Sequence, residues 1–167
     1  MQVKLAEFKA RKQYDLAGNE KIGWNACGLV ASAVPREMND TGWTDMALEY
    51  AENAGNTYSA LFGIQPSNLA IAVRKKLGPD SVTEHNDWTL EGIYNALNSG
   101  QIVVVDILVG SKDQKDSALQ EYPTTQEPNY AHFARVIGID MDNEKIFVEN
   151  TLALQQSEYW EVSFTTF

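Results

Sequence analysis

The sequence contains a single cysteine, Cys27, in a setting that favours nucleophilic chemistry. It stands at the predicted start of a helix, after Asn25 and Ala26 and before Gly28. The positive end of a helix dipole favours negative charge and therefore the thiolate, which is the nucleophilic form of cysteine. A lone cysteine is also commonly a small buried apolar residue, so both interpretations stay open at this point.

The second residue of interest is His132, one of two histidines in the chain. It opens an apolar stretch that is typical of a strand, and a histidine there is suited to act as general base and acid near neutral pH. The competing interpretation is a buried core histidine whose nitrogens are hydrogen-bonded. The other histidine, His85, lies in a polar stretch before Trp88.

The third residue is Asn150, which ends the next predicted strand. A hairpin turn near residues 141–143 would bring this strand beside that of His132, so the two side chains could meet near the open end of the hairpin. An asparagine there can accept a hydrogen bond from the imidazole N–H and orient the ring, although it is also an ordinary turn residue. Glu149 is expected to point to the opposite face. Nucleophile, histidine and amide in this order correspond to a papain-like catalytic site.

The elements that would position these residues are helices in the first half of the chain and strands in the second. Apolar residues at helical spacing, with glycine or proline stops, predict helices over residues 26–34, 44–54, 67–77 and 90–99. β-Branched and alternating runs predict strands over 102–109, 131–139, 145–149 and 159–164, the first of them central in its sheet. A long polar loop over 110–129 separates the first two strands. This order indicates an α+β domain with segregated layers.

Helix ends are predicted from local side chains. Ser67 is a candidate N-cap for the third helix and Thr89 for the fourth, since a hydroxyl oxygen can accept a hydrogen bond from a free backbone N–H. Gly55 and Gly100 are expected to end the second and fourth helices.

Length, composition and charge restrict the function classes. A chain of 167 residues with 44% hydrophobic and 22% charged residues is typical of one globular domain. No stretch approaches about 18 uninterrupted apolar residues, so no membrane span is predicted. The formal net charge of −10 would repel a nucleic-acid backbone, and the basic run Arg74 to Lys76 is typical of a polar helix face. No Cys/His cluster or glycine-rich phosphate motif is present, so we expect no nucleic-acid partner, metal or cofactor.

Three stretches resemble the motifs of papain-like bacterial cysteine peptidases related to the bacteriocin leader-processing (double-glycine) peptidases. They are Gln13 followed by WNACGLVASA at residues 24–33, HFARVIGID at 132–140, and ENT at 149–151. The tail over 159–167 is similar to the closing strand and the start of the final helix of that family. The resemblance spans residues 13–167, and residues 36–100 match only in having helices.

The resemblance implies a papain-like fold, with one domain over residues 1–167, a helical half at about 13–100 and a sheet half at about 101–167. It implies that Cys27 is the nucleophile, that His132 is the general base and that Asn150 orients the imidazole. The Gln13 side chain and the Cys27 backbone N–H would stabilise the oxyanion.

Two positions depart from the family pattern. The family often has aspartate followed by proline where this chain has Asn150 and Thr151, and the spacing from Gln13 to Cys27 is longer than in papain-type motifs. Asn25 is therefore a substitute oxyanion donor.

Trp24 and Tyr130 flank the proposed catalytic residues, and they are expected either to line a substrate cleft or to belong to the core.

The resulting hypothesis is a cysteine peptidase-like hydrolase that cleaves amide bonds of a peptide or protein through a Cys-His-Asn triad and a thioester acyl-enzyme. Two alternatives stay open: an amidase, deamidase or acyl transferase with the same triad, and a catalytically inactive binding module. The sequence predicts no signal peptide after Met1, and a secreted or a cytoplasmic location is left open. An additional domain in a longer native chain is also left open.

Overall fold

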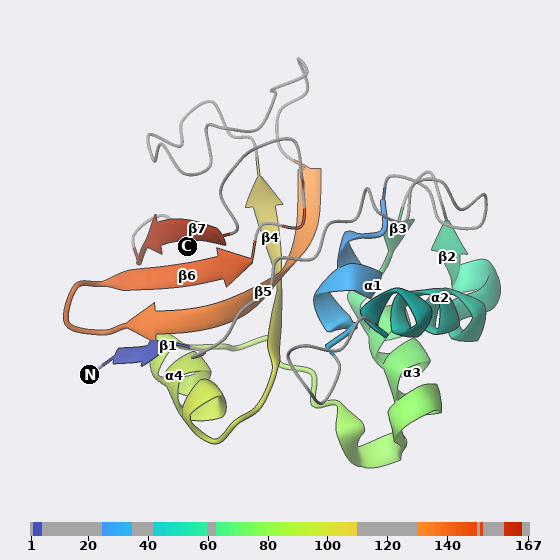
Figure 1. Ribbon diagram of the computed structural model, residues 1–167, viewed down its shortest axis with the longest axis horizontal. Helices are drawn as coiled ribbons and strands as arrows, with labels where there is room; N and C mark the ends of the chain where they lie inside the picture. Colours follow the sequence, from blue (N-terminus) through green and yellow to red (C-terminus); the bar gives the residue numbers. More distant parts are fainter. Residues whose placement is uncertain are drawn as a thin grey trace.

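A computed structural model describes residues 2–4, 25–34, 42–59, 63–109, 130–149, 151 and 159–164 (Figure 1). Its helices are α1 (Cys27–Ser32), α2 (Trp43–Ala54), α3 (Pro66–Leu77) and α4 (Leu90–Asn98), with 3-10 turns η2 (Gly55–Thr57) and η3 (Pro79–Ser81). Its strands are β1 (Gln2–Lys4), β2 (Tyr58–Ser59), β3 (Gly63–Ile64), β4 (Val103–Val109), β5 (Tyr130–Asp140), β6 (Lys145–Glu149) and β7 (Tyr159–Ser163). These elements form a mixed α+β fold, which confirms the predicted class.

The larger sheet is antiparallel and is built around β5. Its strand order is β1-β5-β6-β7, and β4 also pairs with β5. Along one edge, β5 pairs with β4 over residues 130–136 and with β1 over residues 138–140, while β6 pairs with the other edge. The predicted hairpin between β5 and β6 is confirmed, and its turn is held by the Asp140 carboxylate, which accepts hydrogen bonds from the backbone N–H groups of Asp142 and Asn143. β2 and β3 form a separate small sheet.

Two hydrophobic clusters lie on either side of β5, because successive side chains of a strand point to opposite faces. The first joins α1, α2, α3 and β3, and Phe133 of β5 belongs to it. The second joins α4 to β5, β6 and β7, and it includes Ala134, the next residue of β5. In Figure 1, α1, α2 and α3 gather beside the end of the sheet together with β2 and β3, while α4 lies against the sheet away from them.

Several local predictions agree with the structure. The four helices and the four predicted strands are present, with ends shifted by at most two residues. Thr89 caps α4, since its hydroxyl accepts a hydrogen bond from Gly92 N at 3.0 Å. Gly55 ends α2 with a positive φ of 55°, a conformation that costs glycine little.

Other predictions differ. Ser67 is not the N-cap of α3: the cap is Gln65, because Pro66 occupies the first helical turn. β4 is not central, since among the described strands it pairs with β5 alone. The predicted division into a helical half and a sheet half stays a prediction, while α4 packs on the sheet and β1 joins β5. The predicted loop over 110–129 lies outside the described residues.

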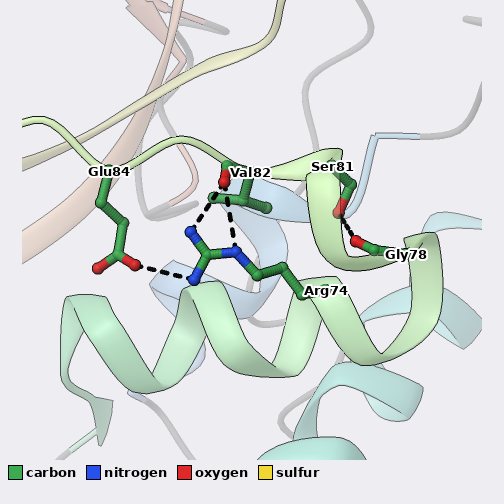
Figure 2. Close-up of polar contacts among 5 residues, drawn as sticks. All are labelled: Arg74, Gly78, Ser81, Val82 and Glu84. Atoms are coloured by element: carbon green, nitrogen blue, oxygen red, sulfur yellow. Dashed lines mark hydrogen bonds and ion pairs between the residues drawn. The ribbon is translucent and has the colours of Figure 1, made fainter.

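The basic run on α3 is used within the fold, as Figure 2 shows for Arg74. Its guanidinium donates to the Val82 carbonyl through Nη2 at 2.8 Å and through Nε at 3.3 Å, and Nη1 pairs with Glu84 at 3.0 Å. Lys75 donates to the backbone carbonyl of Asn53, and Lys76 pairs with Glu49 on α2. These contacts attach α3 to α2 and to the segment that leads to α4.

The helices in the described part of the chain are too short or too polar to cross a membrane.

Candidate functional site

The first turn of α1 packs closely against β5, and Gly28 makes this approach possible. A Cβ atom at Gly28 would lie 3.0 Å from Cδ2 of Phe133, 3.1 Å from Ile64 and 3.2 Å from Leu69. These distances are shorter than ordinary van der Waals contacts, so a side chain larger than hydrogen would push α1 away from its neighbours. The sequence Cys27-Gly28 thus places the thiol directly beside the start of β5.

The surroundings of the Cys27 thiol disfavour its ionisation. Burial raises the pKa of the thiol, and the Asp106 carboxylate on β4 raises it further. Hydrogen bonds from the backbone N–H groups of Phe133 and Gly28 lower the pKa, but burial outweighs them. Burial therefore outweighs the helix start, which favours the thiolate, and the alternative of a buried cysteine is the one that the pKa supports; α1 has only six residues.

His132 is buried at the other side of the same strand end. Its ring lies 6.2 Å from the ring of Trp160 in an edge-to-face arrangement, and its Nε2 lies 3.5 Å from the Thr151 hydroxyl. The side chain is 2% exposed, and this burial lowers the pKa of His132 to about 3. The imidazole is thus neutral near pH 7, and the lowered pKa makes it a weaker base than an ordinary histidine.

The side chains of Cys27 and His132 lie on opposite faces of β5. The thiol contacts the backbone at Phe133, the neighbour of His132, whereas strand alternation directs the imidazole toward the cluster that contains Trp160. Neither group contributes to the pKa shift of the other. The structure therefore brings the two segments together, with the thiol contact at Phe133, the residue that directly follows the histidine.

The segment after β6 also reaches the histidine, through Thr151. Glu149, the last residue of β6, faces away from His132, as strand alternation predicts. It forms a buried ion pair with Arg135 across β5 and β6. Its Oε2 lies 3.0 Å from Nε of Arg135, with side chains 0% and 3% exposed. Glu149 thus fixes the end of β6 beside the strand of His132.

The remaining predicted site residues are placed only in part. Gln13, Trp24 and Asn150 lie outside the described residues. Tyr130 opens β5, two residues before His132. Asn25 is exposed and lies close to β3, where a Cβ on Gly63 would come within 3.3 Å of the Asn25 carbonyl oxygen.

No family model, no curated protein and no solved structure matches the chain.

Sequence reasoning missed Asp106 as a member of this site. A usable signal was present, because Asp106 is the one charged residue in the β4 sequence VVVDILV. Aspartate is depleted in strands, so its presence within an apolar run indicates a specific environment. Among the described residues, no cluster of His, Cys, Asp and Glu could hold a metal ion.

Proposed function

We propose that this protein is a cysteine-dependent amide hydrolase, of the papain-like type related to the leader-processing peptidases, with Cys27 as nucleophile. His132 acts as general base and acid, Asn150 orients its imidazole, and a donor from Gln13 or Asn25 stabilises the oxyanion. The substrate is a peptide or protein.

One observation carries the proposal. Residues 27 and 132, more than a hundred positions apart in sequence, converge on one strand end, where the thiol contacts the backbone of Phe133. Thr151, the neighbour of Asn150, contacts the imidazole from the next strand segment. The three segments that a cysteine-histidine-amide site needs are thus neighbours at this strand end, while the thiol and the imidazole lie on opposite faces of β5.

The proposed chemistry starts from a neutral thiol and a neutral imidazole. The thiol proton passes to His132 as the sulfur attacks the substrate carbonyl carbon, and the amine then leaves with that proton, so that a thioester remains. Water, deprotonated by the same imidazole, attacks the thioester, and the acid product departs as the thiol is regenerated. The transfer requires the imidazole to come within hydrogen-bond reach of the thiol, and such contacts often tighten only when substrate is bound.

The test is amide cleavage across a peptide library, measured by mass spectrometry for the wild type and for variants Cys27→Ala and His132→Ala. We expect cleavage by the wild type, loss in both variants and a thioester adduct on Cys27. The matched control is His85→Ala, because His85 is the other histidine and is exposed between η3 and α4. Cleavage that survives in Cys27→Ala, or its absence from the folded wild type, would refute the proposal.

A non-catalytic binding module is the second candidate, and the pKa values favour it. Burial raises the pKa of the Cys27 thiol and lowers the pKa of His132 to about 3, so the resting site holds no thiolate–imidazolium pair. The two functions differ in the reactivity of the thiol. A binding module would leave Cys27 unreactive toward iodoacetamide until the protein unfolds, whereas a hydrolase requires a thiol that is reactive in the folded protein.

A further inference from the structure

Asp106 is a carboxylate on the strand that borders the candidate nucleophile. β4 reads VVVDILV, so Asp106 is its single charged residue, and it is exposed. No hydrogen bond or ion pair satisfies this carboxylate within the described part of the chain. A carboxylate in a strand whose other residues are apolar, with no cation beside it among the described residues, leaves its charge open within that part of the chain to a cation from outside.

The strand register places Asp106 next to the thiol. Asp106 pairs with Phe133 across β4 and β5, and directly paired residues project from the same face with Cβ atoms about 4.5–5.5 Å apart. Gly28 also approaches the Phe133 ring, since a Cβ atom on Gly28 would lie 3.0 Å from Cδ2 of Phe133. Because Cys27 precedes Gly28, the thiol and the carboxylate lie on the same side of β5, around one aromatic ring.

The electrostatics agree with this placement. Partial burial raises the pKa of Asp106, which indicates that its carboxylate is incompletely hydrated and would gain from a cationic partner. The carboxylate in turn raises the pKa of the Cys27 thiol, so the two groups are within electrostatic range.

We propose that Asp106 binds a positively charged group of the substrate, such as a lysine or arginine side chain next to the scissile amide, and so selects basic substrates. This inference rests on the proposed role of Cys27 as nucleophile. A bound cation would also offset the repulsion between Asp106 and a thiolate, so a basic substrate would promote the ionisation of the group that attacks it. The net charge of −10 attracts such substrates over longer distances.

The experiment measures how fast Cys27 reacts with two methanethiosulfonate reagents, one with a trimethylammonium group and one with a sulfonate. Both form a disulfide with the thiol and release methanesulfinate, so they differ in charge and share their chemistry. For unit charges about 6 Å apart in water, Asp106 changes each rate about threefold, in opposite directions. Asp106→Asn should therefore lower the cation-to-anion rate ratio about tenfold.

Two variants complete the design. Asp106→Glu keeps the charge and should keep the wild-type ratio, and Glu91→Gln removes an exposed carboxylate from α4, which packs against the other cluster, and should also keep it. An unchanged ratio in Asp106→Asn would overturn the proposal, and so would a thiol that neither reagent reaches in the folded protein. Charge-dependent modification without amide cleavage would support the cation site while rejecting the hydrolase. Cleavage with charge-independent modification would overturn the cation site alone.

Discussion

The buried ion pair between Arg135 and Glu149 leads to a quantitative prediction about stability. The two charged atoms lie 3.0 Å apart, and the side chains are 3% and 0% exposed. Replacing Glu149 by Gln leaves a guanidinium buried without its carboxylate. Breaking a buried pair in this way typically costs about 3–5 kcal/mol, which is a large share of the roughly 5–15 kcal/mol by which a domain of this size is stable.

The chain offers a matched control for this substitution. Lys145 and Glu161 also pair across neighbouring strands, β6 and β7, but their side chains are 45% and 44% exposed. Glu161→Gln is the same chemical change in water, and an exposed pair contributes less than about 1 kcal/mol. The difference between the two variants therefore measures the effect of burial.

Urea unfolding followed by tryptophan fluorescence is the assay, and the free energies are compared at unchanged m-value. We expect Glu149→Gln to unfold at much lower urea than Glu161→Gln. The double variant Arg135→Met/Glu149→Leu should recover most of the loss, because it buries neither charge. A Glu149→Gln variant as stable as Glu161→Gln, or a double variant no more stable than Glu149→Gln, would refute this reasoning.

Three further predictions concern single residues. Gly28→Ala should cost about 1–3 kcal/mol from overpacking against Phe133, and the roughly 1 kcal/mol that alanine gains in a helix leaves a net loss of about 0–2 kcal/mol, together with faster thiol alkylation; a urea midpoint above that of the wild type would count against the close packing. Hydrogen bonds from Asn143 lower the pKa of Asp140, so the charge of Asp140 stabilises the fold above about pH 4, and this contribution is lost as pH falls through the lowered pKa. The difference in unfolding free energy between wild type and Asp140→Asn should therefore shrink from pH 7 to pH 3. A constant difference would contradict this role of Asp140. Burial lowers the pKa of His132 to about 3, so the imidazole proton resonances of His132 in NMR should not titrate between pH 8 and 5, and acid should destabilise the fold below about pH 6.5 as the unfolded histidine gains a proton; titration near pH 6.5 in the folded protein would contradict its burial.

The sequence predicted best what depends on neighbouring residues. Thr89 caps α4 through a hydrogen bond that spans three residues, and the turn at Asp140 forms within four. Ser67 was a wrong cap because the proline before it sets the helix start one residue earlier. Such signals are encoded within a single turn of chain, so they can be read without knowledge of the tertiary fold.

The position of β4 illustrates a signal that was present but misinterpreted. Its apolar run indicates burial of both faces, and both faces do pack: Val104 against the first cluster, and Val103 and Val105 against the second. Covered faces do not require paired edges, however, and among the described strands β4 has one neighbour. The apolar run therefore correctly predicted that both faces of β4 are covered, and incorrectly predicted that β4 lies in the centre of its sheet.

The electrostatics of the candidate site could not be predicted from the sequence near Cys27. The helix start favours a thiolate, but the pKa of the thiol is set by burial against β5 and by Asp106, a residue about eighty positions away. The same strand carries Phe133 toward α1 and His132 toward the cluster of Trp160. A substrate that contacts both the Cys27 thiol and the His132 imidazole must therefore bind at the end of β5. A small change in the strand there alters the separation between the two groups. The proposed catalysis would consequently depend on the contacts that hold β5, foremost the close approach of Gly28 and the buried pair of Arg135 with Glu149.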